Sequence, residues 1–211
     1  MPTADPANPP GWSQTTVRTA KDAVRSQIRR ARREAEPSAA VAARTARALQ
    51  VAAGHDVVAA YLSLPGEPDT SALIEALARA GVRVLLPMLG RRADGRVRRE
   101  PDWAEYAGTE LLRIGHAGIA EPTTPALGAD AVAGASLIWC AGLAASPTGD
   151  RLGTGGGWYD RALGHAAPDA VVGVLLRDSE VLDAVPTEPF DRPVTVIVTD
   201  ARTLWTRPHL E

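Results

Sequence analysis

The chain has 211 residues, a formal net charge of −2 and a single cysteine, Cys140. This length suits one large domain or two small ones with a substantial core. The near-neutral charge gives no general attraction to nucleic acids or membrane surfaces, and one cysteine excludes an intrachain disulfide. Residues 1–12 lack the apolar core of a signal peptide and are predicted to form a disordered leader. No apolar run reaches membrane length, so we expect a cytoplasmic protein.

The charge is unevenly distributed along the chain. Residues 13–47 hold nine basic and three acidic residues, a net +6, which leaves −8 for the rest. Apolar residues recur every three or four positions over residues 15–36 and predict a helix whose other faces carry arginines. A second helix is expected from Ser38 to about Ala53. A basic helix can bind RNA or an acidic partner, but without interleaved aromatic residues a solvated face is the default.

The middle of the chain alternates between strand and helix patterns. Apolar, β-branched runs predict strands, a short one near 111–114 and longer ones at 57–62, 82–86, 136–140, 170–176 and 194–198. A helix is expected over 71–80 and a turn over 91–99. The alternation predicts an α/β fold with a mostly parallel sheet. We expect one domain over residues 13–200, followed by a tail at 201–211.

The most informative stretch is a glycine-rich loop between a predicted strand and a predicted helix. Four of the residues from 153 to 157 are glycines, with Arg151 before them and Asp160 after them. Exposed backbone N–H groups at a helix start, a nearby arginine and no Cβ to block close approach favour phosphate binding. The carboxylate of Asp160 could hold a Mg²⁺ bridging the phosphate oxygens.

Two known phosphate-binding motifs do not fit this loop. It lacks the Gly-Lys-Ser/Thr ending of a P-loop, and position 158, where a dinucleotide fingerprint requires a third glycine, is Trp. The alternative is a tight turn whose glycines serve only to adopt positive φ. That alternative does not require four glycines flanked by Arg and Asp.

Several separated residues are expected to meet at one sheet edge. Ligands of open α/β sheets bind at the carboxyl ends of the strands. Loops at 63–70, 87–92, 141–156 and 177–192 begin there, so Glu67, Arg151, Asp160 and Asp191 could converge. Lys21 is the only lysine, and a compact ammonium suits a phosphate, although a solvated lysine on a basic helix is the simpler interpretation.

With these residues in place, the chain resembles the 5-formyltetrahydrofolate cyclo-ligase family, also called 5,10-methenyltetrahydrofolate synthetase. The most specific match is the segment from Arg151 to Arg161. Supporting matches are Lys21-x-x-x-Arg25, residues 61–70, residues 118–122 and residues 188–191. The resemblance implies a three-layer α/β sandwich of the kind shared with sugar-phosphate isomerases and CoA transferases.

The resemblance also implies an activity and a set of roles. The activity would be ATP- and Mg²⁺-dependent cyclisation of 5-formyltetrahydrofolate to the 5,10-methenyl compound. Separately, we expect a monomer with no nucleic-acid or membrane partner. Catalytic roles would fall to Lys21 and Arg151, and Mg²⁺ would bind Asp160 and Asp191. ATP would contact Lys21, Arg25, Arg151, Leu152, Gly153, Thr154, Gly155, Gly156, Gly157, Trp158 and Tyr159. The folate would contact Leu62, Glu67, Thr154, Gly155, Gly156, Gly157 and Trp158.

The chain departs from the family pattern at three places. Trp158 replaces a usual Tyr, Ala141 a usual Pro, and Ala145-Ser146 a usual Phe-Asp. Two other functions remain open at this point. One is another phosphate-ligand enzyme on the same fold, such as a sugar-phosphate isomerase, and the other is a non-catalytic relative that binds a partner through the basic first helix.

Overall fold

The computed structural model describes residues 14–91 and 95–206. The predicted leader, part of the predicted turn around Asp94, and His209 lie outside these residues. Within them, no helix has the length and apolar character needed to cross a membrane.

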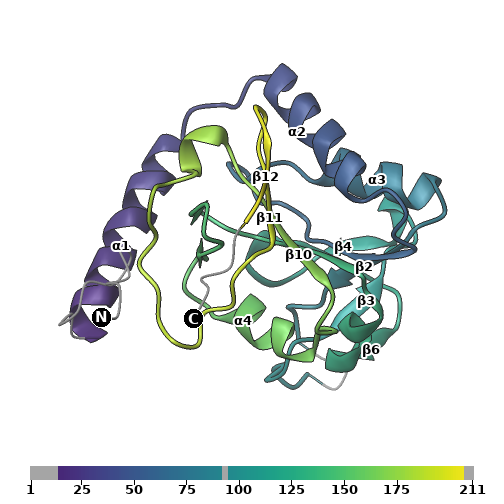
Figure 1. The fold of residues 1–211 in the computed structure, drawn as a ribbon. Coiled ribbons are helices and arrows are strands. Elements are labelled where there is room, and N and C mark those ends of the chain that lie inside the picture. The colour runs from purple at the N-terminus through teal and green to yellow at the C-terminus, as the bar shows by residue number, and fades with distance from the viewer. Residues whose placement is uncertain (1–13, 92–94, 207–211) are drawn as a thin grey trace.

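An eight-stranded sheet forms the centre of the molecule (Figure 1). Its spatial order is β12-β11-β10-β7-β1-β2-β3-β6, in which the five strands from β11 to β2 are parallel and the pairings of β12 with β11, β3 with β2 and β6 with β3 are antiparallel. The strands are β1 (Val57–Ala59), β2 (Arg83–Pro87), β3 (Trp103–Glu105), β6 (Ala126–Gly128), β7 (Leu137–Cys140), β10 (Val171–Leu175), β11 (Val196–Val198) and β12 (Thr203–Trp205). The predicted mostly parallel α/β fold is therefore confirmed.

Helices cover both faces of the sheet and make it the middle layer. Helices α2 (Ser38–Val51) and α3 (Ser71–Arg79) pack on one face, where alternate strand residues join their apolar side chains in the largest core cluster. The short helix α4 (Trp158–Ala162) and 3-10 turns at 129–134 and 163–165 cover the other face. In β1, Val58 belongs to the first cluster and Ala59 to the second, as the two-residue period of a strand requires.

Helix α1 (Gln14–Ala31) lies outside these layers, along the carboxyl edge of the parallel strands (Figure 1). Val24 packs against a small cluster that includes Leu152 and Val185. The helix ends five residues earlier than predicted. The next residue, Arg32, is buried and bonded through Nε and Nη2 to the Glu180 carboxylate at 2.6 and 2.8 Å.

Several short strands were not predicted from the sequence. The pairs β4 (Leu112–Ile114) with β5 (Ala120–Pro122) and β8 (Ala144–Ala145) with β9 (Arg151–Leu152) form two small hairpins. Only β4 was expected. The main sheet also continues past residue 200, because β12 pairs antiparallel with β11.

Candidate functional site

Arg151 is placed by the β8–β9 hairpin rather than by a loop. It was expected within the glycine loop, but it pairs across the hairpin with Ala145. Its side chain is buried, and Nη1 donates to the carbonyl oxygen of Ala141 at 3.1 Å. Nη2 donates to Oδ1 of Asp160 at 2.7 Å, so the two residues form an ion pair across the glycine loop.

The glycine loop is held to helix α1 by two arginines. Arg25 donates from Nε to the carbonyl oxygen of Gly153 at 3.0 Å, and Arg29 donates to that of Thr154 at 3.2 Å. Gly155 and Gly157 have φ values of 107° and 62°, which a side chain would strain. Positive φ therefore accounts for two of the four glycines, and the alternative of a simple turn explains only those two.

Lys21 connects helix α1 to the loop before β11. Its Nζ lies 2.6 Å from Oε2 of Glu188 and 2.6 Å from Oδ2 of Asp191. The ammonium also lies 5.6 Å from the centre of the Phe190 ring. The side chain is 5% exposed, so the only lysine is a buried, doubly paired group and not a solvated one.

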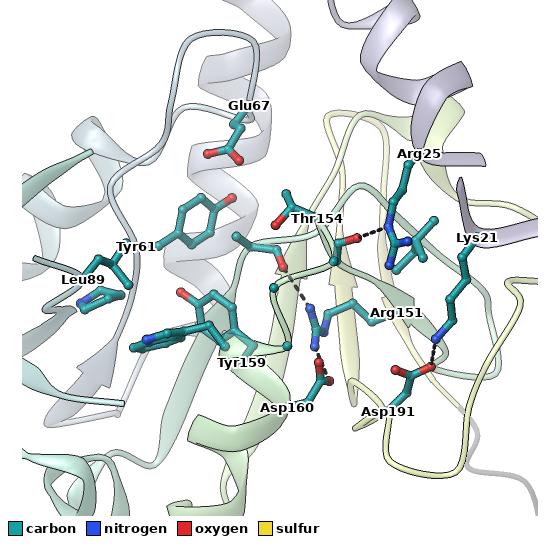
Figure 2. Close-up of a pocket in the computed structure, with 18 of the residues that line it drawn as sticks. Lys21, Arg25, Tyr61, Glu67, Leu89, Arg151, Thr154, Tyr159, Asp160 and Asp191 are labelled. Atoms are coloured by element: carbon teal, nitrogen blue, oxygen red, sulfur yellow. Dashed lines mark hydrogen bonds and ion pairs between the residues drawn. The ribbon is translucent and has the colours of Figure 1, made fainter. Parts of the chain in front are cut away.

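A single cavity of about 610 Å³ brings these groups together, a volume typical of small-molecule sites. As expected, Glu67, Arg151, Asp160 and Asp191 all line it, although the first and last are far apart in the chain. Figure 2 shows Tyr61, Glu67 and Leu89 at one end and Lys21, Arg25 and Asp191 at the other. The remaining positions singled out by sequence analysis also line it: Leu62, Leu152, Gly153, Thr154, Gly155, Gly156, Gly157, Trp158 and Tyr159.

The end of the cavity near Glu67 is aromatic. Tyr61 is buried and Tyr159 is partly exposed, but the hydroxyl of Tyr159 is itself buried, and desolvation raises the pKa of both hydroxyls above the ordinary tyrosine value. Within the described residues the Tyr159 hydroxyl has no hydrogen-bond partner. Oε2 of Glu67 accepts the backbone N–H of Leu64 at 2.8 Å, which fixes the direction of the carboxylate.

Trp158 shows how one departure from the family pattern is accommodated. Its ring lies edge-on to that of the fully buried Trp103, with 5.1 Å between centroids. It makes a similar contact with Tyr159 at 4.9 Å. The larger ring thus extends the aromatic wall of the cavity into the core, where it has a packing partner.

Sequence reasoning missed some residues of the cavity. Tyr61, Glu188, Ile119 and Ala120 all line the cavity. Each belongs to a segment that matched the family, but no role was predicted for any of them. Membership of a matched motif was the signal that could have found them. Leu89 lies in the loop at 87–92, which was expected at this edge of the sheet, but the residue itself was not singled out, and Arg18 carried no signal of its own.

The residues present fit a Mg²⁺ that also binds a ligand. Within the described residues, no three His, Cys, Asp or Glu side chains are grouped closely enough to hold a metal ion alone. In the same part of the chain, Asp160 and Asp191 each keep one carboxylate oxygen that accepts no hydrogen bond, Oδ2 and Oδ1 respectively. Mg²⁺ commonly uses one or two carboxylates and completes its shell with phosphate oxygens and water.

A parallel sheet with a deep, partly aromatic and partly charged cavity at its carboxyl edge defines an α/β enzyme that acts on a small molecule. Residues 15–200 match the 5-formyltetrahydrofolate cyclo-ligase family. The chain belongs to this family of ligases. It is 39% identical over 145 residues to the 5-formyltetrahydrofolate cyclo-ligase of Mycolicibacterium smegmatis, covering 69% of this chain and 74% of that one. The Escherichia coli K12 cyclo-ligase is 32% identical over 149 residues, covering 70% and 79%.

Solved structures confirm the fold. The NMR structure of Aquifex aeolicus 5,10-methenyltetrahydrofolate synthetase superposes with a TM-score of 0.72 at 21% identity, covering 90% of this chain and 95% of that one. The corresponding Mycoplasma pneumoniae enzyme gives a TM-score of 0.65 at 16% identity, covering 85% and 98%. The predicted fold class is thus that of methenyltetrahydrofolate synthetases.

Proposed function

We propose that this chain converts 5-formyltetrahydrofolate and ATP to 5,10-methenyltetrahydrofolate, ADP and phosphate, with Mg²⁺ as the metal cofactor. One observation carries the proposal. A single cavity joins an aromatic end, which suits a flat heterocycle, to a charged end built around a glycine loop. Family membership supports the identity of the folate.

The folate is assigned to the aromatic end. Tyr61, Trp158 and Tyr159 provide ring faces and apolar edges, and Leu62 adds an aliphatic contact. Glu67 is held by the Leu64 N–H and can accept hydrogen bonds from the N–H groups of a pterin ring.

The triphosphate of ATP is assigned to the glycine loop. An added Cβ at Gly156 would meet no atom within 4 Å, and the residue does not have positive φ, so the protein itself does not require glycine there. A closely approaching phosphate would require it. Arg25 and Arg151 flank the loop and can donate charge-assisted hydrogen bonds.

The charge balance of the cavity supports the use of Mg²⁺. Four basic and five acidic side chains line it, and the buried cations Lys21 and Arg151 are already paired with carboxylates. A triphosphate therefore needs an added divalent cation, for which Asp160 and Asp191 have oxygen ligands. When bound, the ion neutralises charge on the phosphate oxygens.

The proposed reaction begins with attack of the formyl oxygen on the γ-phosphorus of ATP. The oxygen–phosphorus bond forms and ADP leaves. The product of this step is an N5-iminium phosphate, in which the former formyl carbon is electrophilic. N10 then attacks this carbon and releases its proton, and the carbon–oxygen bond breaks as phosphate departs. The chain contributes alignment and charge: Arg151 and Lys21 stabilise negative charge that spreads over the transferred phosphoryl oxygens.

The test is a continuous absorbance assay for the methenyl product. Purified protein is mixed with 5-formyltetrahydrofolate and Mg²⁺, and ATP is added last. We expect a rise that requires ATP and stops when a chelator removes Mg²⁺. Folded protein that gives no ATP-dependent rise, beside an active relative measured in parallel, would refute the proposed function.

A further inference from the structure

Glu121 lies beside the wall of the cavity and does not line it. The residue is 2% exposed and belongs to β5, next to Ala120, which does line the cavity. Oε2 accepts the backbone N–H groups of Leu89 and Gly90 at 3.0 and 2.8 Å. One carboxylate oxygen therefore fastens the segment that follows β2 onto the β4–β5 hairpin.

The other carboxylate oxygen is also engaged. Oε1 accepts a bond of 3.0 Å from Nη2 of Arg113, which faces Glu121 across the hairpin. Arg113 is half exposed, so this bond neutralises the buried carboxylate from the solvent side. Among the residues that the structure describes, Glu121 thus receives three donors, two from the backbone after β2 and one from a half-exposed side chain.

Two glycines make room for this carboxylate. A Cβ on Gly90 would lie 2.5 Å from Oε1 of Glu121, and one on Gly115 would lie 2.6 Å from its Cδ. Neither glycine has positive φ, so their backbones do not need glycine. The space they leave is filled by the carboxylate, which shows how closely both segments pack around it.

We infer that Glu121 is a positioning residue for the folate end of the cavity. It holds Leu89, two residues after the end of β2, and Leu89 lines one cavity together with Ile119 and Ala120 of the hairpin segment. Without its two backbone bonds, the segment after β2 would lose its attachment to the hairpin. This inference rests on the proposed function, because it assigns that wall to the folate.

The inference predicts a selective kinetic effect. In Glu121→Ala the KM for 5-formyltetrahydrofolate should rise about tenfold, since hydrogen bonds to a charged group contribute on that order. The KM for ATP and the kcat should stay within about twofold. Glu121→Gln should keep a folate KM near that of the wild type, because its amide oxygen can accept both N–H groups while the exposed Arg113 turns away.

A second variant disturbs the Glu121 carboxylate without removing it. Gly115→Ala places a methyl group against Glu121 and should displace the carboxylate from Leu89 and Gly90, raising the folate KM in the same selective way. Glu105→Ala is the matched control. Glu105 is a half-exposed carboxylate on neighbouring β3 that pairs with Arg83 and does not line the cavity, so its loss should change neither KM.

Hydrogen exchange provides a readout that does not depend on activity. The amides of Leu89 and Gly90 should be protected in the ligand-free wild type and in Glu121→Gln, and should exchange faster in Glu121→Ala. Unchanged exchange in Glu121→Ala would overturn the inference, as would equal rises in both KM values or a Gln variant that behaves like Ala. A wild-type protein that forms no methenyl product would instead refute the proposed function, while exchange would still decide the role of Glu121.

Discussion

The ammonium of Lys21 lies 2.6 Å from the carboxylate of Asp191, although the two residues are 170 positions apart. The same ammonium binds Glu188, so one lysine fastens helix α1 to the loop before β11 and closes the charged end of the cavity. In the proposed complex Asp191 would hold Mg²⁺ through its other oxygen, and Lys21, whose ammonium has three N–H donors, would have one left for the phosphate.

Lys21→Gln should lower kcat/KM for ATP by about 100-fold or more, because a charge aimed at the transferred phosphoryl group is lost. Lys21→Arg should restore little, because the guanidinium fork cannot replace a compact ammonium held at 2.6 Å by two carboxylates. Arg30→Gln, an exposed cation on the same helix, is the control and should behave like wild type. Wild-type ATP kinetics in a folded Lys21→Gln variant would contradict this role.

Gly156→Ala should raise the KM for ATP about tenfold or more and leave thermal stability nearly unchanged. The structure has open space at this position, so a methyl group should meet only the ligand. Gly164→Ala is the matched control, since that glycine also has open space and no positive φ but does not line the cavity. Steady-state kinetics and thermal unfolding of both variants test this prediction. A KM for ATP in Gly156→Ala equal to that of the wild type would show that Gly156 is not part of the phosphate site.

Glu67→Gln should weaken folate binding about tenfold and leave ATP binding intact. The amide can still accept the Leu64 N–H, so the local backbone is preserved, but the negative charge offered to the pterin is lost. Titration calorimetry with each ligand measures both affinities, and Glu75→Gln, an exposed acid on α3, is the control. A folate affinity equal to that of the wild type would place Glu67 outside the binding site.

Much of this fold could be predicted because its central elements have strong local patterns. The buried strand β7 has four apolar side chains, and the apolar stripe of α3 packs on the sheet as its spacing requires. The convergence of Glu67 and Asp191 followed from one general property, that parallel strands end at the same edge. The monomeric state, the cytoplasmic location and the domain limits stay predictions.

The parts of the fold that were not predicted depend on contacts between residues far apart in the chain, and such contacts produce no clear pattern in the local sequence. Strand β6 is only three residues long and all three are exposed, and β9 has two residues, so neither shows a period. Arg151 was assigned to a loop for this reason. Likewise helix α1 was predicted to reach residue 36 but ends at Ala31, and the next residue, Arg32, pairs with Glu180 far along the chain.

Cys140 should not react with a thiol reagent at pH 8 while the protein is folded. Complete burial raises the pKa of its thiol from 9.0 to about 12, outweighing the lowering effect of Arg151. Because the folded pKa exceeds the unfolded one, the resulting stabilisation is fully present below about pH 9 and is lost as the pH rises through about 12. Labelling with Ellman's reagent should give no thiol before denaturation and one after it; rapid labelling of native protein would contradict the placement of β7.

The most direct test of the account follows the oxygen of the formyl group. Substrate carrying ¹⁸O in this group is converted with unlabelled ATP and Mg²⁺, and the released phosphate is analysed by mass spectrometry. If the formyl oxygen is phosphorylated at the charged end of the cavity, one ¹⁸O appears in each phosphate released with methenyl product. Product formation with unlabelled phosphate would show that the formyl oxygen leaves by another route and would contradict the proposed mechanism.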